Sequence, residues 1–304
     1  MHAITLATFS QISSTAAAMC CAGFVVLLIG LLAAKRHIAE ARGLNKIVAM
    51  SNLCFAIPLA IFGALHLFGP QFVKAIVPDY MPLRMFWVYF VGCALVAAAI
   101  SIASKVAVQW SALLFGLMMF SFVAMLHFPG ALAARHNRIL WTIVFRESSF
   151  GGAAWVLAGS AVAAWSTRSK VTLMTVGRIL VAMAAVVFGV EHFLHPTGLP
   201  GVSLLRQIPA WLRGRVIIDY VTGAGLLATG LCTLLNWRTR IAATWLGSWI
   251  FLLVVVMYIP VMVTALGDPN IGAQIEGINY FGDTLLFGAE FLVIAQAMSR
   301  FDKS

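Results

Sequence analysis

Long apolar segments alternate with short polar connections along the whole chain, and the lengths of these segments predict membrane-spanning helices. A helix needs about 20 mostly apolar residues to cross the hydrocarbon core of a bilayer. The sequence therefore predicts an all-α fold, a polytopic transmembrane helical bundle with about nine spans. The predicted spans are Ala17–Ala34, Ile47–Phe68, Met85–Ala103, Val108–Phe128, Leu140–Trp165, Val176–Leu194, Val216–Leu235, Ala242–Leu266 and Tyr280–Met298.

Composition supports this interpretation and excludes other classes of protein. Of the 304 residues, 62% are hydrophobic and 10% are charged, whereas an ordinary globular domain carries about 25% charged residues. Such a chain lacks the charges to cover a water-facing surface, so membrane lipids are the expected partners. The net charge of +10 does not indicate nucleic-acid binding, because the basic residues are scattered between apolar blocks. The five cysteines form no C-x-x-C motif, so the signature of a dithiol relay is missing.

The distribution of Lys and Arg predicts the orientation in the membrane, because cytoplasmic loops carry an excess of these residues. Residues 1–16 hold no Lys or Arg, so the first span is expected to be a retained helix and not a signal peptide. Twelve basic residues against seven favour an external N-terminus and a cytoplasmic C-terminus in a bacterial inner (plasma) membrane. The twelve are Lys35, Arg36, Arg42, Lys46, Lys105, Arg168, Lys170, Arg178, Arg238, Arg240, Arg300 and Lys303.

The chain also matches itself, which predicts an internal duplication. Residues Phe62–His66 align with Phe188–His192 at a shift of 126 residues, and the shift is 131 over the next two helices. In the last helices Glu147 meets Asp283 at a shift of 136. Each half holds four spans, an even number, so both have the same orientation and form tandem parallel repeats. The predicted domains are an N-terminal helix with its basic loop at 1–45, a first four-helix unit at 46–170 and a second at 171–304.

Two further features recur in both halves. Small residues allow close approach of membrane helices, so the repeat-matched Gly63, Gly92, Gly116 and Gly152 are expected at helix contacts. Between its first and second helices each half carries a segment rich in proline and aromatic residues, Gly69–Leu83 and His195–Gly214. Such segments suit the outer headgroup layer of a membrane. An ordinary connecting loop is the alternative.

A series of short motifs carries a resemblance to a known family. In the first half these residues are His66-Leu67-Phe68, Pro70, Phe72, Ile76-Val77-Pro78, Tyr80, Pro82, Tyr89 and Gly92, and in the second half His192-Phe193, Pro196, Pro209 and Gly223. In these residues the chain resembles the DoxX-like membrane proteins over roughly residues 47–298. The resemblance implies two fused four-helix units and, as in some relatives, a place in a thiosulfate–quinone oxidoreductase system. Many family members carry a Glu where this chain has Leu95 and Leu226, so no role is carried over for that carboxylate.

Ionisable residues inside the predicted spans are candidates for function, because they cost at least about 2.5–3.5 kcal/mol on insertion scales. On the nine-span topology all but Glu290 fall at the outer ends of their helices, and Glu290 lies near mid-membrane. Arg146 stands next to Glu147, which indicates mutual neutralisation or binding of an anionic head group. The nine candidates are His66, His127, Arg146, Glu147, Glu191, His192, Asp219, Asp283 and Glu290.

The duplication singles out His66 with Glu147 and His192 with Asp283 as a histidine–carboxylate pair in each half. A carboxylate can hold an imidazole in one tautomer, which is what a proton or quinone site requires. The alternative is that each pair only fixes the register of two helices. Glu191 points away from His192 on a helix, so no metal site is predicted. A haem held by His66 and His192 is conceivable, but no other feature of the sequence calls for it.

The leading hypothesis is a quinone-proximal subunit of a membrane redox system, in which the four paired residues exchange protons with a quinone and a redox partner protein supplies electrons. One alternative is a small-molecule or lipid permease, with Glu290 and Asp219 along its path. The other is a non-catalytic membrane scaffold, in which the polar residues only specify helix packing. Whether the protein is an enzyme is left open by the sequence.

Overall fold

A computed structural model describes residues 12–161, 165–201 and 214–301, and within these ranges the chain forms helices and no strands. The helices are α2 (Ser14–Glu40), α3 (Asn45–Val48), α4 (Ser51–Phe68), α5 (Pro70–Lys74), α6 (Arg84–Ser104), α7 (Val108–Phe122), α8 (Phe128–Ala133), α9 (Arg138–Ala161), α10 (Thr167–Leu194), α11 (Arg215–Leu234), α12 (Thr239–Leu253), α13 (Ile259–Leu266) and α14 (Ile271–Phe301). Two π-helices, η1 (Val123–His127) and η2 (Val254–Tyr258), join α7 to α8 and α12 to α13.

Eight helical segments in the described part of the chain are long and apolar enough to cross a membrane. They are α2, α4, α6, α7–η1–α8, α10, α11, α12–η2–α13 and α14. These segments confirm an all-helical chain with the character of an integral membrane protein. The ninth predicted span, Leu140–Trp165, corresponds to α9, which has 24 residues but is not among these eight apolar segments.

The last helix begins earlier than its apolar character predicts. Helix α14 starts at Ile271 and not at Tyr280, because polar side chains in its first turns find partners inside the protein. Gln274 is fully buried, accepts a hydrogen bond from the backbone N–H of Ser13 and donates to Asp268 O. Asp283 therefore does not lie in the first turn of its helix, since about 18 Å of helix precedes it.

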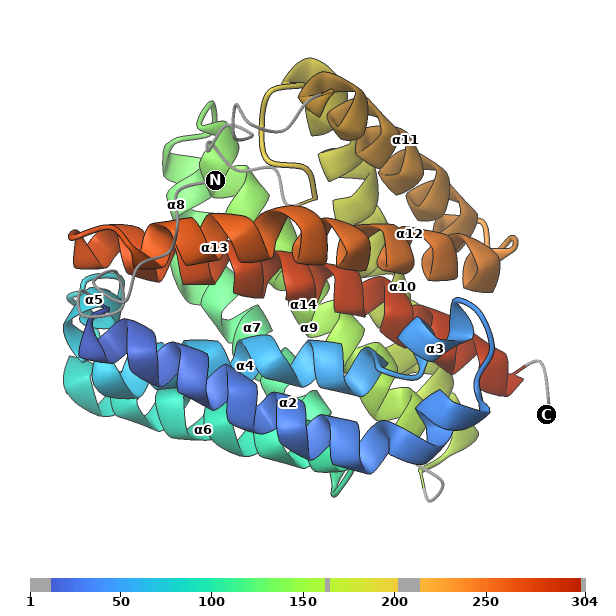
Figure 1. Cartoon of the computed structure of the whole chain (residues 1–304), viewed down its shortest axis with the longest axis horizontal. Helices are drawn as coiled ribbons and strands as arrows, with labels where there is room; N and C mark the ends of the chain where they lie inside the picture. Colours follow the sequence, from blue (N-terminus) through green and yellow to red (C-terminus); the bar gives the residue numbers. More distant parts are fainter. Residues whose placement is uncertain (1–11, 162–164, 202–213, 302–304) are drawn as a thin grey trace.

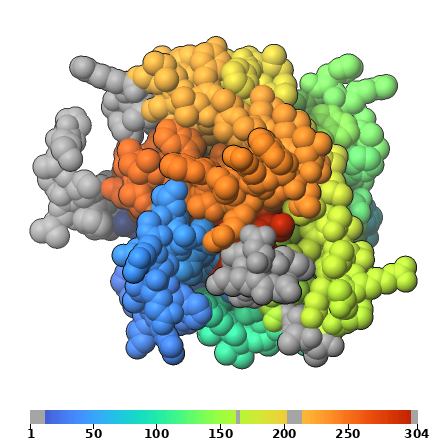
Figure 2. Space-filling model, turned by 90° about the vertical axis from the view of Figure 1, so that its right-hand side faces the viewer, coloured from blue at the N-terminus to red at the C-terminus, as the bar shows by residue number. Residues whose placement is uncertain are grey.

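Helix α14 occupies the centre of the bundle and packs against α4, α9 and α12 (Figure 1). Seen from the end at which the chain terminates, the residues near α3, the start of α10 and α12 surround the end of α14 (Figure 2). The peripheral helices expose large apolar side chains, among them Leu32, Leu114 and Trp245. Exposed apolar surface of this extent suits contact with lipid and not with water.

The fourth helix of each predicted half packs against the first helix of the other half. Helix α9 lies along α10, and α14 lies along α4. In contrast, the first two helices of each half pack against each other, α4 on α6 and α10 on α11. The two halves therefore share one core.

The prediction that repeat-matched glycines lie at helix contacts is confirmed. A Cβ atom on Gly63 would come within 2.7 Å of Val96 Cγ2, and one on Gly92 within 2.8 Å of His66 Cβ. A Cβ atom on Gly116 would meet the Trp155 ring at 2.5 Å. Gly152 faces the backbone of Gly177 in the same way. Larger residues at these positions would force the helices apart.

The two predicted segments between the first and second helices are described to different extents. The first, Gly69–Leu83, contains the short helix α5 followed by turns. Of the second, His195–Gly214, residues 202–213, including Pro209, lie outside the described part of the chain.

Candidate functional site

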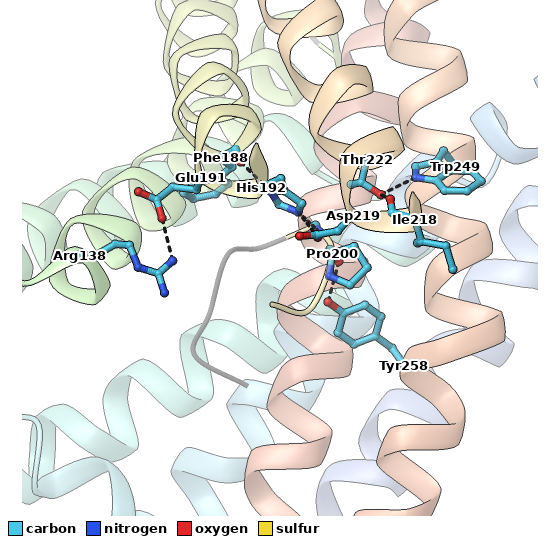
Figure 3. Close-up of polar contacts among 11 residues, drawn as sticks. Arg138, Phe188, Glu191, His192, Pro200, Ile218, Asp219, Thr222, Trp249 and Tyr258 are labelled. Atoms are coloured by element: carbon cyan, nitrogen blue, oxygen red, sulfur yellow. Dashed lines mark hydrogen bonds and ion pairs between the residues drawn. The ribbon is translucent and has the colours of Figure 1, made fainter. Parts of the chain in front are cut away.

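Two clusters of buried and partly buried polar side chains contain ionisable groups. The His192 cluster comprises His192 on α10, Asp219 on α11, Tyr258 at the end of η2 and the backbone of residues 200–201 (Figure 3). The Arg146 cluster comprises Arg146, Glu147 and Ser149 on α9 with Asp283 and Glu290 on α14. These two clusters thus take their side chains from five helical elements, namely α9, α10, α11, η2 and α14.

Both ring nitrogens of His192 face backbone groups, and these contacts define its tautomer. Nδ1 lies 2.6 Å from Phe188 O, so Nδ1 carries a hydrogen and donates it to this carbonyl oxygen. Gly201 N–H donates to Nε2 at 2.9 Å, so Nε2 is an acceptor. The imidazole is therefore neutral, as suits a side chain that is 2% exposed.

Asp219 points at the same Nε2 atom. Its Oδ1 lies 3.5 Å from Nε2 (Figure 3), the residue is 1% exposed, and neither carboxyl oxygen has a hydrogen-bond partner among the described residues. Two acceptors that face each other in an apolar interior repel, and a proton on the carboxyl group removes this repulsion. The carboxyl group of Asp219 is therefore a site for one exchangeable proton beside the imidazole.

The segment before residue 202 covers this pair. Tyr258 Oη donates to Pro200 O at 2.8 Å, and Leu199 is buried beside it. Gly201 has φ +113°, a backbone conformation that L side chains rarely adopt. The glycine at this position allows the N–H group to turn toward His192.

One arginine joins two acids in the Arg146 cluster. Arg146 Nη1 lies 2.7 Å from Asp283 Oδ2, and Nη2 lies 2.9 Å from Glu147 Oε1. All three side chains are only 13–14% exposed. The predicted neutralisation of Arg146 by Glu147 is confirmed, and Asp283 adds a second acid from the other half of the chain.

Glu290 lies deeper on α14 and is fully buried. Its Oε1 is 3.0 Å from Ser149 Oγ, and its Oε2 has no hydrogen-bond partner among the described residues. Ser149 Oγ also lies 2.8 Å from Arg146 O. Ser149 therefore connects the backbone of Arg146 to the carboxyl group of Glu290 in the protein interior.

Tyr258 connects the two clusters. Its hydroxyl group lies within electrostatic range of Asp219 and Asp283, and both Tyr258 and Thr284, the neighbour of Asp283, lie beside Gly201. Tyr258 therefore lies between the His192 cluster and α14.

The predicted pairs of His66 with Glu147 and of His192 with Asp283 are not formed among the described residues. His66 Nδ1 contacts Phe62 O at 2.7 Å, and Glu147 pairs with Arg146. The exchange of fourth helices between the halves explains the difference, because α9 and α14 each lie along the first helix of the opposite half. His192 instead meets Asp219.

The remaining predicted residues lie around the clusters. Glu191 pairs with Arg138 at 2.7 Å and lies 3.9 Å from His195. His127, half-buried at the end of η1, lies within electrostatic range of Glu147. In the part of the chain that the structure describes, no three His, Cys, Asp or Glu side chains are placed to hold one metal ion.

Sequence reasoning missed three participants in these clusters, namely Tyr258, Ser149 and Gly201. For Tyr258 a signal exists, because it stands opposite His127 at the shift of 131 residues. Ser149 and Gly201 have no such counterpart, and their roles depend on the packing of α9 and on the path of the segment after α10.

Comparison with models of known protein families, with curated proteins and with solved structures finds no match to this chain.

Proposed function

We propose that the protein is an integral membrane protein of two DoxX-like four-helix units that exchanges protons at His192 and Asp219, as the quinone-proximal subunit of a membrane redox system. The observation that carries the proposal is the buried carboxyl group of Asp219, which faces an imidazole nitrogen that already accepts a hydrogen bond. Reduction of a quinone to a quinol takes up two electrons and two protons. In this proposal a redox partner protein supplies the two electrons, Asp219 donates one proton to a quinone oxygen, and water supplies the second proton.

An exposed aromatic pair beside this site favours a flat, lipid-soluble ligand. Phe193 and Tyr220 follow His192 and Asp219 directly in the sequence, and their rings stack with centroids 5.5 Å apart and an interplanar angle of 22°. Both side chains are exposed on the surface of the bundle. A planar ring that stacks on this pair lies on the lipid-facing surface of α10 and α11, the two helices that carry His192 and Asp219, and aromatic stacking contributes about 0.5–1.5 kcal/mol.

The two-unit architecture is supported by backbone details that recur at the shift of 131 residues. The π-helices η1 and η2 are five residues long, start at Val123 and Val254, and are each followed by a helix with proline in its first turn. Left-handed backbone also recurs, since Lys105 corresponds to Asn236 and Ala107 to Arg238. Apolar character alone does not place such irregularities at equal spacing.

We further propose that the N-terminus lies outside and the C-terminus in the cytoplasm of a bacterial inner membrane. Lys105 contacts His37, and Arg178 on α10 contacts Asn236, so basic side chains lie beside the connections that follow α2, α6 and α11. This clustering agrees with the positive-inside rule. The His192 cluster then faces the outer half of the membrane.

Quinone binding tests the proposal. Purified protein in lipid nanodiscs is titrated with a short-chain ubiquinone, and quenching of tryptophan fluorescence gives the Kd. Asp219→Asn and His192→Gln are expected to raise the Kd about tenfold, which corresponds to about 1.4 kcal/mol for a lost polar contact. His66→Gln is the matched control, because the position opposite Asp219 is the apolar Val88 and His66 faces no acid there. Absence of binding by the unaltered protein, or an equal loss in His66→Gln, would contradict the proposal.

The stability of Asp219→Val separates this function from a purely structural role. Val88 occupies the equivalent position in the first half and is equally buried. Removal of a buried carboxyl group without partners is expected to raise the free energy of unfolding by about 1 kcal/mol while quinone binding is lost. Thermal unfolding in detergent measures the first effect and the quinone titration the second. A scaffold in which Asp219 holds helices together requires the opposite change in stability.

A second candidate function, a permease, is favoured by Glu290, because a fully buried acid beyond the midpoint of α14 is typical of transport paths. Cysteine substitutions along α14 and α9, labelled with membrane-impermeant maleimide from each side, distinguish the two functions. A permease requires at least one position at mid-depth that reacts from both sides. The quinone site requires reaction from the outer side only.

A further inference from the structure

Three acids recur on α14 at every seventh residue, Glu276, Asp283 and Glu290. Seven residues are close to two helical turns, so the three side chains occupy one face at intervals of about 10 Å. Glu276 is exposed, Asp283 is 9% exposed and Glu290 is fully buried. The acids therefore descend from the surface into the interior of the bundle.

Side chains of α9 occupy the interval between the two inner acids. Arg146 bridges Asp283 and Glu147, and Ser149, one turn further along α9, contacts Glu290. The interval of about 10 Å between successive acids is too long for direct proton transfer. A proton therefore needs water molecules between the acids, and the Ser149 hydroxyl group supplies the last oxygen before Glu290.

Hydrogen-bond counting indicates that Glu290 carries a proton. The Ser149 hydroxyl group has one hydrogen, and it lies 2.8 Å from Arg146 O and 3.0 Å from Glu290 Oε1. A backbone carbonyl oxygen is only an acceptor, and so is an ionised carboxylate. Both contacts are hydrogen bonds when Ser149 donates to Arg146 O and a protonated Glu290 donates to Ser149 Oγ.

The charges around Glu290 favour the same state. Glu147 on α9 acts on it as a like charge, and Asp283 lies on its own helix. Arg146 is already bound to both of these acids. On the side of α4, the titratable residue Cys54 lines a small apolar space together with Ala289, the residue before Glu290. A buried acid in these surroundings is stable as the neutral form.

We propose that Glu290 is a proton-binding site in the membrane interior, loaded from the surface along the acids of α14 through water molecules between them and the Ser149 hydroxyl group. The proposal goes beyond the quinone function and does not depend on it, since it concerns a different carboxyl group on a different helix. In each step one proton leaves one oxygen and joins the next, so no oxidant or reductant takes part.

Infrared spectroscopy tests the protonation of Glu290. The probe is the C=O stretching band of a protonated carboxylic acid, recorded on reconstituted Asp219→Asn protein so that Asp219 does not contribute. Addition of Glu290→Gln is expected to remove this band, and Glu290→Asp is expected to retain it at a shifted frequency. Circular dichroism confirms that each variant is folded. Absence of the band in the Asp219→Asn protein, or its persistence in the Glu290→Gln double variant, would overturn the proposal.

Exchange in D2O tests the route. The Glu290 band moves to lower frequency when its proton is replaced by deuterium, and the rate of this shift reports access to the site. Glu276→Gln, at an exposed position, is expected to slow the shift severalfold, whereas Glu40→Gln, an exposed acid on α2, is expected to leave it unchanged. Equal rates in the two variants would overturn the route. A failed quinone titration with an intact Glu290 band would contradict only the function proposed at His192.

Discussion

Replacement of Arg146 by methionine is expected to lower the free energy of unfolding by about 3–5 kcal/mol, because it leaves two buried acids without their cation. Arg146 contacts Glu147 and Asp283 at 2.9 Å and 2.7 Å, and all three side chains are 13–14% exposed. Methionine has a similar length and preserves much of the apolar packing. The loss should therefore report the charges and not a cavity.

Thermal or SDS-induced unfolding of the purified protein measures this effect. Arg36→Met is the matched control, because Arg36 pairs with Glu40 on an exposed face, and such pairs contribute about 0–1 kcal/mol. Conversion of the two acids to Glu147→Gln and Asp283→Asn in the Arg146→Met protein should restore part of the stability. Equal losses in Arg146→Met and Arg36→Met would contradict the role assigned to the Arg146 cluster.

Gly177→Ala is expected to produce the second large effect, a loss of about 3 kcal/mol, at the contact between α9 and α10. A Cβ atom on Gly177 would lie 2.1 Å from the backbone oxygen of Gly152. A flexible side chain can move away from an added methyl group, but a backbone oxygen within a helix cannot. The cost should therefore lie near the upper end of the usual range for overpacking.

Gly130→Ala provides the control for this prediction. Gly130 lies in α8, and an added Cβ atom would meet no atom within 4 Å. Because alanine has a higher helix propensity than glycine, this variant should be as stable as the original protein or slightly more stable. The same unfolding measurement compares the two variants. A Gly177→Ala protein as stable as Gly130→Ala would show that α9 and α10 are not in close contact.

The helices can be predicted well from the sequence because the length of an apolar segment is a local property of the chain. The prediction failed at the start of α14, where Gln274 and Glu276 resemble loop residues, since the partners of Gln274 come from residues 13 and 268. No local pattern reports such distant contacts.

The predicted polar residues do come together, but with different partners. The duplication suggested that His192 pairs with Asp283 of the same half, whereas the structure brings His192 to Asp219 and Asp283 to Arg146. Equivalent positions in two repeats indicate equivalent places in the fold and not which helix of which half lies opposite. The crossing of α9 and α14 between the halves determines the pairing.

This crossing has a consequence for the synthesis of the protein. Helix α9 is less apolar than the eight spans around it and carries Arg146 with one acid beside it. The second acid, Asp283, belongs to the last helix and leaves the ribosome only after 136 further residues have been made. A partly synthesised chain thus holds Arg146 of α9 without the second of its two acidic partners. The bundle can close only when translation is almost complete, and chains that terminate early should be substrates for membrane proteases.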